Sequence, residues 1–466
     1  MGSHNAALLT RPSPEHGTSM SYTELKAALA GLTLLTVATV PALSQTQETL
    51  CLNKGGAHPV DQSIDACTAL IASGRWNGEN LVKIFGSRGN AWKDKGNLDR
   101  AMADYDKALQ IDPNNALTYI NRGNAWQAKG NLDRALANYD KALQIDPNKS
   151  LTYNNRGVIW QAKGNLNRAM ADYDKALQID PNNALTYINR GNAWKDKGNL
   201  DRAMAEYDKA LQIDPNNALT YNNRGVIWKD KGNLDRALAN YDKALQIDSN
   251  YLQAYNNRGV IWQAKGNLDR AMADYDKALQ IDPNKSPTYL DRGNAWKDKG
   301  NLDRAMADYD KAIQLDPNYA LAYHNRGNAW QAKGNLNRAM ADYDKAIQID
   351  PNYAGTYNGR CWLRATSGRD LSQALTDCDT ALRIKPGDVD TLDSRGLVHL
   401  KLGALDKAIT DYTAVLSTKA TSASALYGRG IAKRRSRDKS GGDSDVTRAV
   451  AIQADIAKTY AGYGIQ

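Results

Sequence analysis

The sequence predicts an all-α fold in which pairs of short helices stack along the chain. A 34-residue pattern begins at Val82 and recurs, almost unchanged, at Ala116, Ser150, Ala184, Ala218, Leu252, Ser286 and Ala320. Within each copy, the aromatic and small residues have the three- and four-residue spacing of a helix face. Almost every copy closes on Asp-Pro-Asn, and proline cannot continue a helix. A fixed period of this size is typical of stacked helix pairs.

One copy, numbered from 1 to 34, shows how its two helices form. Position 4 is aromatic, position 8 is Gly and position 11 is Trp, so one helical face carries Tyr119, Gly123 and Trp126. Gly at position 15 suits a left-handed helix end, and the Asn after it can cap the second helix. The second helix carries Ala, Tyr and Ala at positions 20, 24 and 27. We expect Ala opposite Gly to permit close helix approach, and the Tyr and Trp stripes to form the core.

These positions resemble the tetratricopeptide repeat family, and the resemblance covers about 80% of the chain. It implies a right-handed superhelical solenoid of about ten stacked helix-turn-helix repeats with an atypical C-terminal capping repeat. Two departures from the family pattern occur. Position 7, usually a large apolar residue, is Arg, as in Arg156, and it is expected to pair with an Asp at position 25 such as Asp140. In one repeat, Ser249 replaces the proline.

The pattern divides the chain into five segments. Residues 1–44 form a leader with a signal peptide at about 20–44, and residues 45–81 form a degenerate N-terminal capping repeat. Residues 82–353 hold eight regular repeats, 354–422 two irregular ones, and 423–466 a C-terminal capping repeat. In the last segment we expect the basic run Lys433–Arg437 to be a solvated loop and a final helix to span about Asp445 to Tyr460.

The leader has the three-part form of a secretory signal. Lys26 gives a short positive end, Ala27–Val40 is uncharged and mostly apolar, and small residues precede a cleavage point near Ser44. This predicts export to the periplasm or the medium, from a start at either Met1 or Met20. An uncleaved membrane anchor or a buried helix is the alternative interpretation.

The four cysteines favour two disulfide bonds. Cys361 and Cys378 stand at positions 8 and 24 of an irregular repeat that carries one extra residue, and Cys51 and Cys67 have the same spacing without it. We therefore expect both pairs to occupy facing sites on antiparallel helices, within reach of a disulfide. Two disulfides agree with an oxidising compartment, whereas four buried thiols are the alternative.

Composition and motifs argue against catalysis and nucleic-acid binding. The net charge is +9, but Lys, Arg and Asp alternate in every repeat, which is typical of a solvated surface. The chain has no phosphate-binding glycine loop, nucleophile elbow or paired-histidine zinc motif. We therefore expect no enzyme activity, cofactor, metal, nucleic acid or small-molecule substrate.

The family resemblance implies that the first helix of each pair lines an inner groove, through positions 2, 5, 6, 9, 12 and 13. Asn at position 6 offers donors and an acceptor, so a row of them can pair with the backbone of an extended peptide. This row resembles the asparagine ladder of the eukaryotic N-acetylglucosamine transferase that modifies nuclear and cytoplasmic proteins. The predicted groove residues are Asn121, Asn155, Asn189, Asn223, Asn257, Asp291 and Asn325 at position 6, Asn124 and Asn192 at position 9, and Lys195, Lys229 and Lys297 at position 12.

These observations predict a non-enzymatic scaffold that binds a polypeptide partner in its groove. Two rival interpretations remain. The chain could be a structural spacer or self-assembling rod with an idle groove, or a membrane-tethered assembly factor. A ladder of Asn that only bonds locally is also compatible with the sequence, because duplication copies residues whether or not they are used.

Overall fold

The computed structural model describes residues 47–53 and 56–465, so the predicted leader with its cleavage point at Ser44 lies outside the described residues. The described residues form two compact units, and the boundary between them falls between Asp214 and Pro215. Both are built of helices joined by short turns, with no strand in the part that is described.

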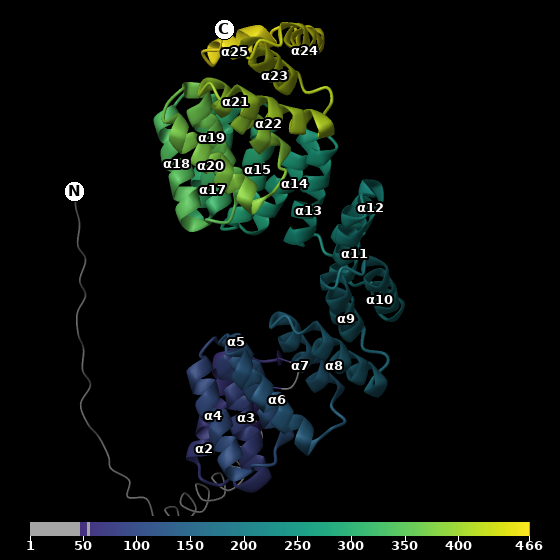
Figure 1. The fold of residues 1–466 in the computed structure, drawn as a ribbon. Helices are drawn as coiled ribbons and strands as arrows, with labels where there is room; N and C mark the ends of the chain where they lie inside the picture. Colours follow the sequence, from purple (N-terminus) through teal and green to yellow (C-terminus); the bar gives the residue numbers. More distant parts are fainter. Residues whose placement is uncertain (1–46, 54–55, 466) are drawn as a thin grey trace, which may run out of the picture. The chain divides into compact units, whose positions relative to one another are not determined.

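In the first unit, residues 47–52 are helical and precede α2 (Val60–Ala72). Four helix pairs follow, one for each repeat, and Figure 1 shows them in chain order. They are α3 (Gly78–Asp94) with α4 (Leu98–Ile111), α5 (Ala116–Ala128) with α6 (Leu132–Ile145), α7 (Ser150–Ala162) with α8 (Leu166–Ile179), and α9 (Ala184–Asp196) with α10 (Leu200–Ile213).

The second unit continues the same arrangement and ends in a short additional helix, α25 (Ile456–Gly462). Its pairs are α11 (Ala218–Asp230) with α12 (Leu234–Ile247), α13 (Leu252–Ala264) with α14 (Leu268–Ile281), α15 (Ser286–Asp298) with α16 (Leu302–Leu315), α17 (Ala320–Ala332) with α18 (Leu336–Ile349), α19 (Ala354–Ser367) with α20 (Leu371–Ile384), α21 (Val389–Lys401) with α22 (Leu405–Thr418), and α23 (Ala423–Arg435) with α24 (Lys439–Ile452).

The turn inside each pair follows the predicted chemistry. Gly130 at position 15 has φ 76°, a left-handed conformation that suits glycine. Asn131 then caps α6, because its side chain accepts a hydrogen bond from the backbone N–H of Arg134. Tight turns of this kind bring the two helices of a repeat into antiparallel contact.

The core of each pair is built around the Tyr of position 24. Tyr139 is fully buried, and a Cβ placed on Gly123 would lie 2.6 Å from Cε1 of its ring. The Gly of position 8 thus makes room for the ring of this Tyr. The sequence had suggested only that this Gly lies opposite an Ala and lets the helices approach closely. The Trp of position 11 is only half-buried: in Trp126 one ring face is covered by the guanidinium of Arg134, 4.4 Å from the ring centroid. Trp126 nevertheless packs against the buried cluster that contains Ala135 and Tyr139, so the expected Trp stripe lies at the edge of the core and the Tyr stripe inside it.

Two predictions for the C-terminal segment are wrong. The basic residues Lys433 to Arg435 form the last turn of α23 and are not a loop, since Lys433 bonds to Asp445 and Arg434 to Asp443. The expected single final helix is two helices, α24 and α25, which residues 453–455 separate. None of the described helices combines the length and the apolar character that crossing a membrane would require.

Candidate functional site

The Asn residues of position 6 are half-buried on the first helices, and several of them bond to the preceding repeat. In the first unit, Asn155 donates from Nδ2 to Oδ1 of Asn124 at 3.2 Å, and Asn189 donates to Oδ1 of Asn154 at 2.9 Å. In the second unit the corresponding bonds run from Asn257 to Asn222 at 2.9 Å and from Asn325 to Asn294 at 3.0 Å. The ladder predicted from the sequence is thus cross-linked between repeats.

The choice of acceptor follows the residue at position 9. Where the preceding repeat has Asn there, as with Asn124, the ladder residue bonds to it. Where position 9 is Val, as with Val158, the acceptor is the Asn of position 5, Asn154. The alternation of Asn and Val along the sequence therefore decides which side chain of the preceding repeat holds each ladder amide.

Each of these bonds uses one N–H of the ladder amide. The side-chain oxygen of Asn155 accepts a hydrogen bond from Nδ2 of Asn154 at 3.3 Å. Within the described part of the chain, the side-chain oxygens of Asn189, Asn257 and Asn325 accept no hydrogen bond. The amides are consequently held in fixed orientations while they retain hydrogen-bonding capacity for another molecule.

Asp291 interrupts the ladder in α15. A carboxylate has no N–H to donate, and Asp291 makes no hydrogen bond to a described residue, whereas Oδ1 of Asn256 in the preceding repeat is buried without a donor. Burial raises the pKa of Asp291 to about 6. In the following repeat, burial and the charge of Lys297 lower the pKa of His324 to about 4, so this imidazole is neutral at physiological pH.

The residues at positions 12 and 13 form a second polar row. Gln161 donates to Asp196 of the next repeat at 2.6 Å, and Gln263 donates in the same way to Asp298. Lys195 and Lys297 at position 12 make no ion pair with a described residue, and Lys229 approaches only Asp230, at 3.9 Å. Beside the ladder the surface therefore presents cations that can still meet a ligand.

The Arg of position 7 ties successive repeats together. Arg156 donates two hydrogen bonds to Asp172 at position 23 of its own repeat, and a third, at 2.7 Å, to Asp140 at position 25 of the preceding repeat. The predicted pairing with position 25 is confirmed. The pairing with position 23 was missed, although Arg and Asp or Glu separated by sixteen residues recur in many of the repeats. The ring of Tyr153 at position 4 covers the guanidinium at 5.4 Å.

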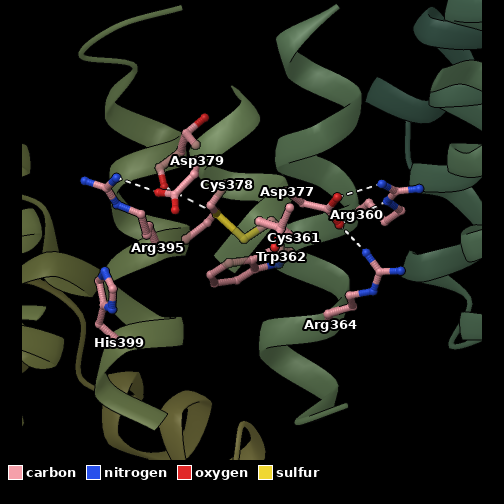
Figure 2. The surroundings of a disulfide bond; sticks show 12 residues. Arg360, Cys361, Trp362, Arg364, Asp377, Cys378, Asp379, Arg395 and His399 are labelled. Carbon is pink, nitrogen blue, oxygen red and sulfur yellow. Dashed lines mark hydrogen bonds and ion pairs between the residues drawn. A yellow bond between two sulfur atoms is a disulfide. The ribbon is translucent and has the colours of Figure 1, made fainter. Parts of the chain in front are cut away.

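Both predicted disulfide bonds are present. Cys51 is bonded to Cys67, and Cys361 to Cys378. The second bond takes the place of the Gly–Tyr pair at positions 8 and 24. Figure 2 shows this disulfide beside Asp377, on which the guanidinium groups of Arg360 and Arg364 converge. The irregular repeat thus keeps the inter-helix contact of its neighbours in covalent form.

These features define a class: an all-helical repeat protein whose first helices, in each unit, carry polar side chains at the same repeat positions. The family model for the TPR repeat matches residues 89–130, 191–229, 227–266 and 293–334, and the model for the tetratricopeptide repeat matches 116–149, 150–183, 252–285 and 320–353. Together they cover more than half of the chain, which therefore belongs to the tetratricopeptide repeat family.

Solved structures with the same fold include a tetratricopeptide repeat protein from Parabacteroides merdae, with 22% identity, a TM-score of 0.44, and coverage of 53% of this chain and 97% of that chain. The APC/C hetero-tetramer Cut9–Hcn1 has 13% identity and a TM-score of 0.48, with coverage of 85% and 91%. YrrB, described as having an unusual peptide-binding site, has 26% identity and a TM-score of 0.32, with coverage of 40% and 97%. No curated protein matches the chain.

Proposed function

We propose that this chain is a non-enzymatic scaffold that binds an extended polypeptide along the position-6 ladder. The observation that supports this most strongly is the unused oxygen of the ladder amides, of which Asn189, Asn257 and Asn325 are examples. The repeat family supports the broader class of a protein-protein interaction scaffold.

Backbone recognition follows from this chemistry. The side-chain oxygens of Asn189, Asn257 and Asn325 can accept hydrogen bonds from the N–H groups of any extended chain, whatever its side chains. The bonds to the preceding repeat fix these amides in advance, so little side-chain entropy is lost on binding. Lys195 and Lys297 add cations beside the row, and Asp291 adds one negative charge that favours a basic side chain of the partner.

Binding to an array of short unstructured peptides tests the proposal. The triple variant with Asn121, Asn155 and Asn189 replaced by Ala should lose most binding, and peptides with N-methylated backbones should bind poorly to the natural protein. The matched control replaces the exposed Gln144, Gln178 and Gln212 of the second helices by Ala and should bind normally.

Equal binding by both triple variants, with unfolding curves that match the natural protein, would remove the ladder from the mechanism. In the same array, Asp291→Asn should abolish any preference for Arg-containing peptides. Concentration-dependent association of the chain, without peptide capture, would instead favour the self-assembling rod.

We further propose that the protein is exported. The leader has the composition of a secretory signal, and the two disulfides are compatible with an oxidising compartment. On this proposal the exported protein begins near Gln45, with residues 45–81 and 423–466 as caps of the repeat array. An N-terminal sequence that retains residues 27–40 would favour the membrane-tethered alternative.

A further inference from the structure

A small pocket lies in the last full repeat, between α22, α23 and α24, away from the ladder positions. Its volume is about 280 Å³, and its walls include Thr413, Leu416, Leu426, Arg429 and Arg448. Arg429 is the position-7 Arg of this repeat, so the other repeats show what normally surrounds the same guanidinium group.

In the regular repeats two side chains enclose this guanidinium. In the second unit, Arg258 is covered by the ring of Tyr255 at position 4, 5.5 Å away, and Nη1 of Arg258 donates to Asp242 at position 25 of the preceding repeat, 2.6 Å away. Seven other position-7 Arg residues also donate from Nη1 to an Asp at position 25 of the preceding repeat. These pairs are Arg122 with Asp106, Arg156 with Asp140, Arg190 with Asp174, Arg292 with Asp276, Arg326 with Asp310, Arg360 with Asp344 and Arg395 with Asp379.

At Arg429 both enclosing residues are smaller. Position 4 is Leu426, and position 25 of the preceding repeat is Thr413, whose hydroxyl oxygen is 3.3 Å from Nη1 of Arg429. A neutral hydroxyl at this distance is a weak substitute for a carboxylate, since charge-assisted hydrogen bonds are shorter and stronger. The pocket opens beside Thr413, where most other repeats place the Asp side chain.

The pocket also has an excess of positive charge. The buried Asp445 accepts hydrogen bonds from Nε and Nη2 of Arg429 and from Lys433, and Arg448 lies 3.9 Å from it. Burial alone would raise the pKa of Asp445, but the bonds from Arg429 and Lys433 hold it below its ordinary value. One carboxylate therefore faces three cations, and a second anion would be electrostatically favoured.

We propose that this pocket binds a small organic acid with a single carboxylate and a short apolar body. The carboxylate takes the place of the absent position-25 Asp, where Nη1 of Arg429 and the guanidinium of Arg448 can donate to it. The apolar body packs against Leu416, which is only partly buried in the wall of the pocket. The site does not depend on peptide binding by the ladder.

Calorimetric titration of the full chain with 4-methylpentanoate and with 4-methylpentanamide tests this. The acid should bind at least about tenfold more tightly than the neutral amide, as expected for charge-assisted hydrogen bonds. The decisive variant is Thr413→Asp, which supplies the carboxylate that most other repeats carry and should abolish binding while the protein stays folded. Arg448→Ala should weaken binding about tenfold and leave the core intact, because Arg448 is largely exposed.

Two further probes separate the possible sources of the carboxylate. A peptide that ends in Leu with a free C-terminus is compared with its amidated form, which shows whether a chain end enters the pocket. Binding of either the small acid or the free chain end supports the site, provided that Thr413→Asp abolishes it. Equal binding of acid and amide, binding that survives Thr413→Asp, or binding of inorganic phosphate in preference to the acid would overturn it.

Discussion

Replacing Asp291 by Asn should stabilise the protein at all pH values, and clearly more at neutral pH than in acid. The change restores the residue that most regular repeats carry at position 6, so the backbone and the packing have precedents in the same chain. The change in the free energy of unfolding therefore reports mainly on one carboxylate that is buried without a hydrogen-bond partner.

The size of the effect follows from the pKa. Burial raises the pKa of Asp291 from 3.8 to about 6, and each pH unit corresponds to about 1.4 kcal/mol, so the ionised carboxylate costs about 2–3 kcal/mol at neutral pH. The cost is present above the folded-state pKa and disappears as the pH falls from about 6 to about 4, where both folded and unfolded states become protonated. The new Asn can also donate to the unpaired oxygen of Asn256, which is worth about 1 kcal/mol at any pH.

Urea unfolding of both proteins at about pH 7.5 and about pH 4.5 measures the difference, and hydrogen exchange in α13 to α16 localises it, because repeat arrays do not always unfold as one unit. The variant should gain about 3–4 kcal/mol at the higher pH and about 2 kcal/mol at the lower. Asn257→Asp is the matched control: it moves the carboxylate to the preceding repeat, removes the bond to Asn222, and should destabilise with the opposite pH dependence. A gain for Asp291→Asn that is the same at both pH values would refute the reasoning about burial.

Two further predictions concern positions 8 and 24. Replacing Cys361 and Cys378 by Ser should lower the free energy of unfolding in urea by about 3 kcal/mol, as for other disulfides that close loops of this length. Replacing them by Gly and Tyr should restore most of this loss. Equal losses in the two variants would show that the disulfide is not a substitute for the Gly–Tyr pair. Gly123→Ala should lower the free energy of unfolding by about 1–3 kcal/mol, because the new Cβ would lie 2.6 Å from the ring of Tyr139. An unchanged midpoint of urea unfolding would mean that the two helices can move apart at little cost.

Much of the fold and part of the candidate site could be predicted from the sequence. Gly130 and Asn131 marked the turn, the spacing of Cys361 and Cys378 indicated their disulfide, and Arg156 with Asp140 indicated a contact between repeats. These succeed because each depends on residues at fixed separations in a helix pair whose geometry the period already sets. The segment that ends in α25 was less predictable, since no repeat elsewhere in the chain provides a template for it.

The sequence by itself determined the repeat, its helix boundaries and the residue types along each helix face, because hydrophobic periodicity, glycine and proline act locally. Only the tertiary structure decided which polar groups are used within the protein and which remain available. Asn189 and Asn257 belong to the same row as Asp291, yet two of them bond to the preceding repeat and the third is isolated. The difference depends on which side chains two successive helices bring within about 3 Å, a distance at which a hydrogen bond forms and which sequence spacing does not specify.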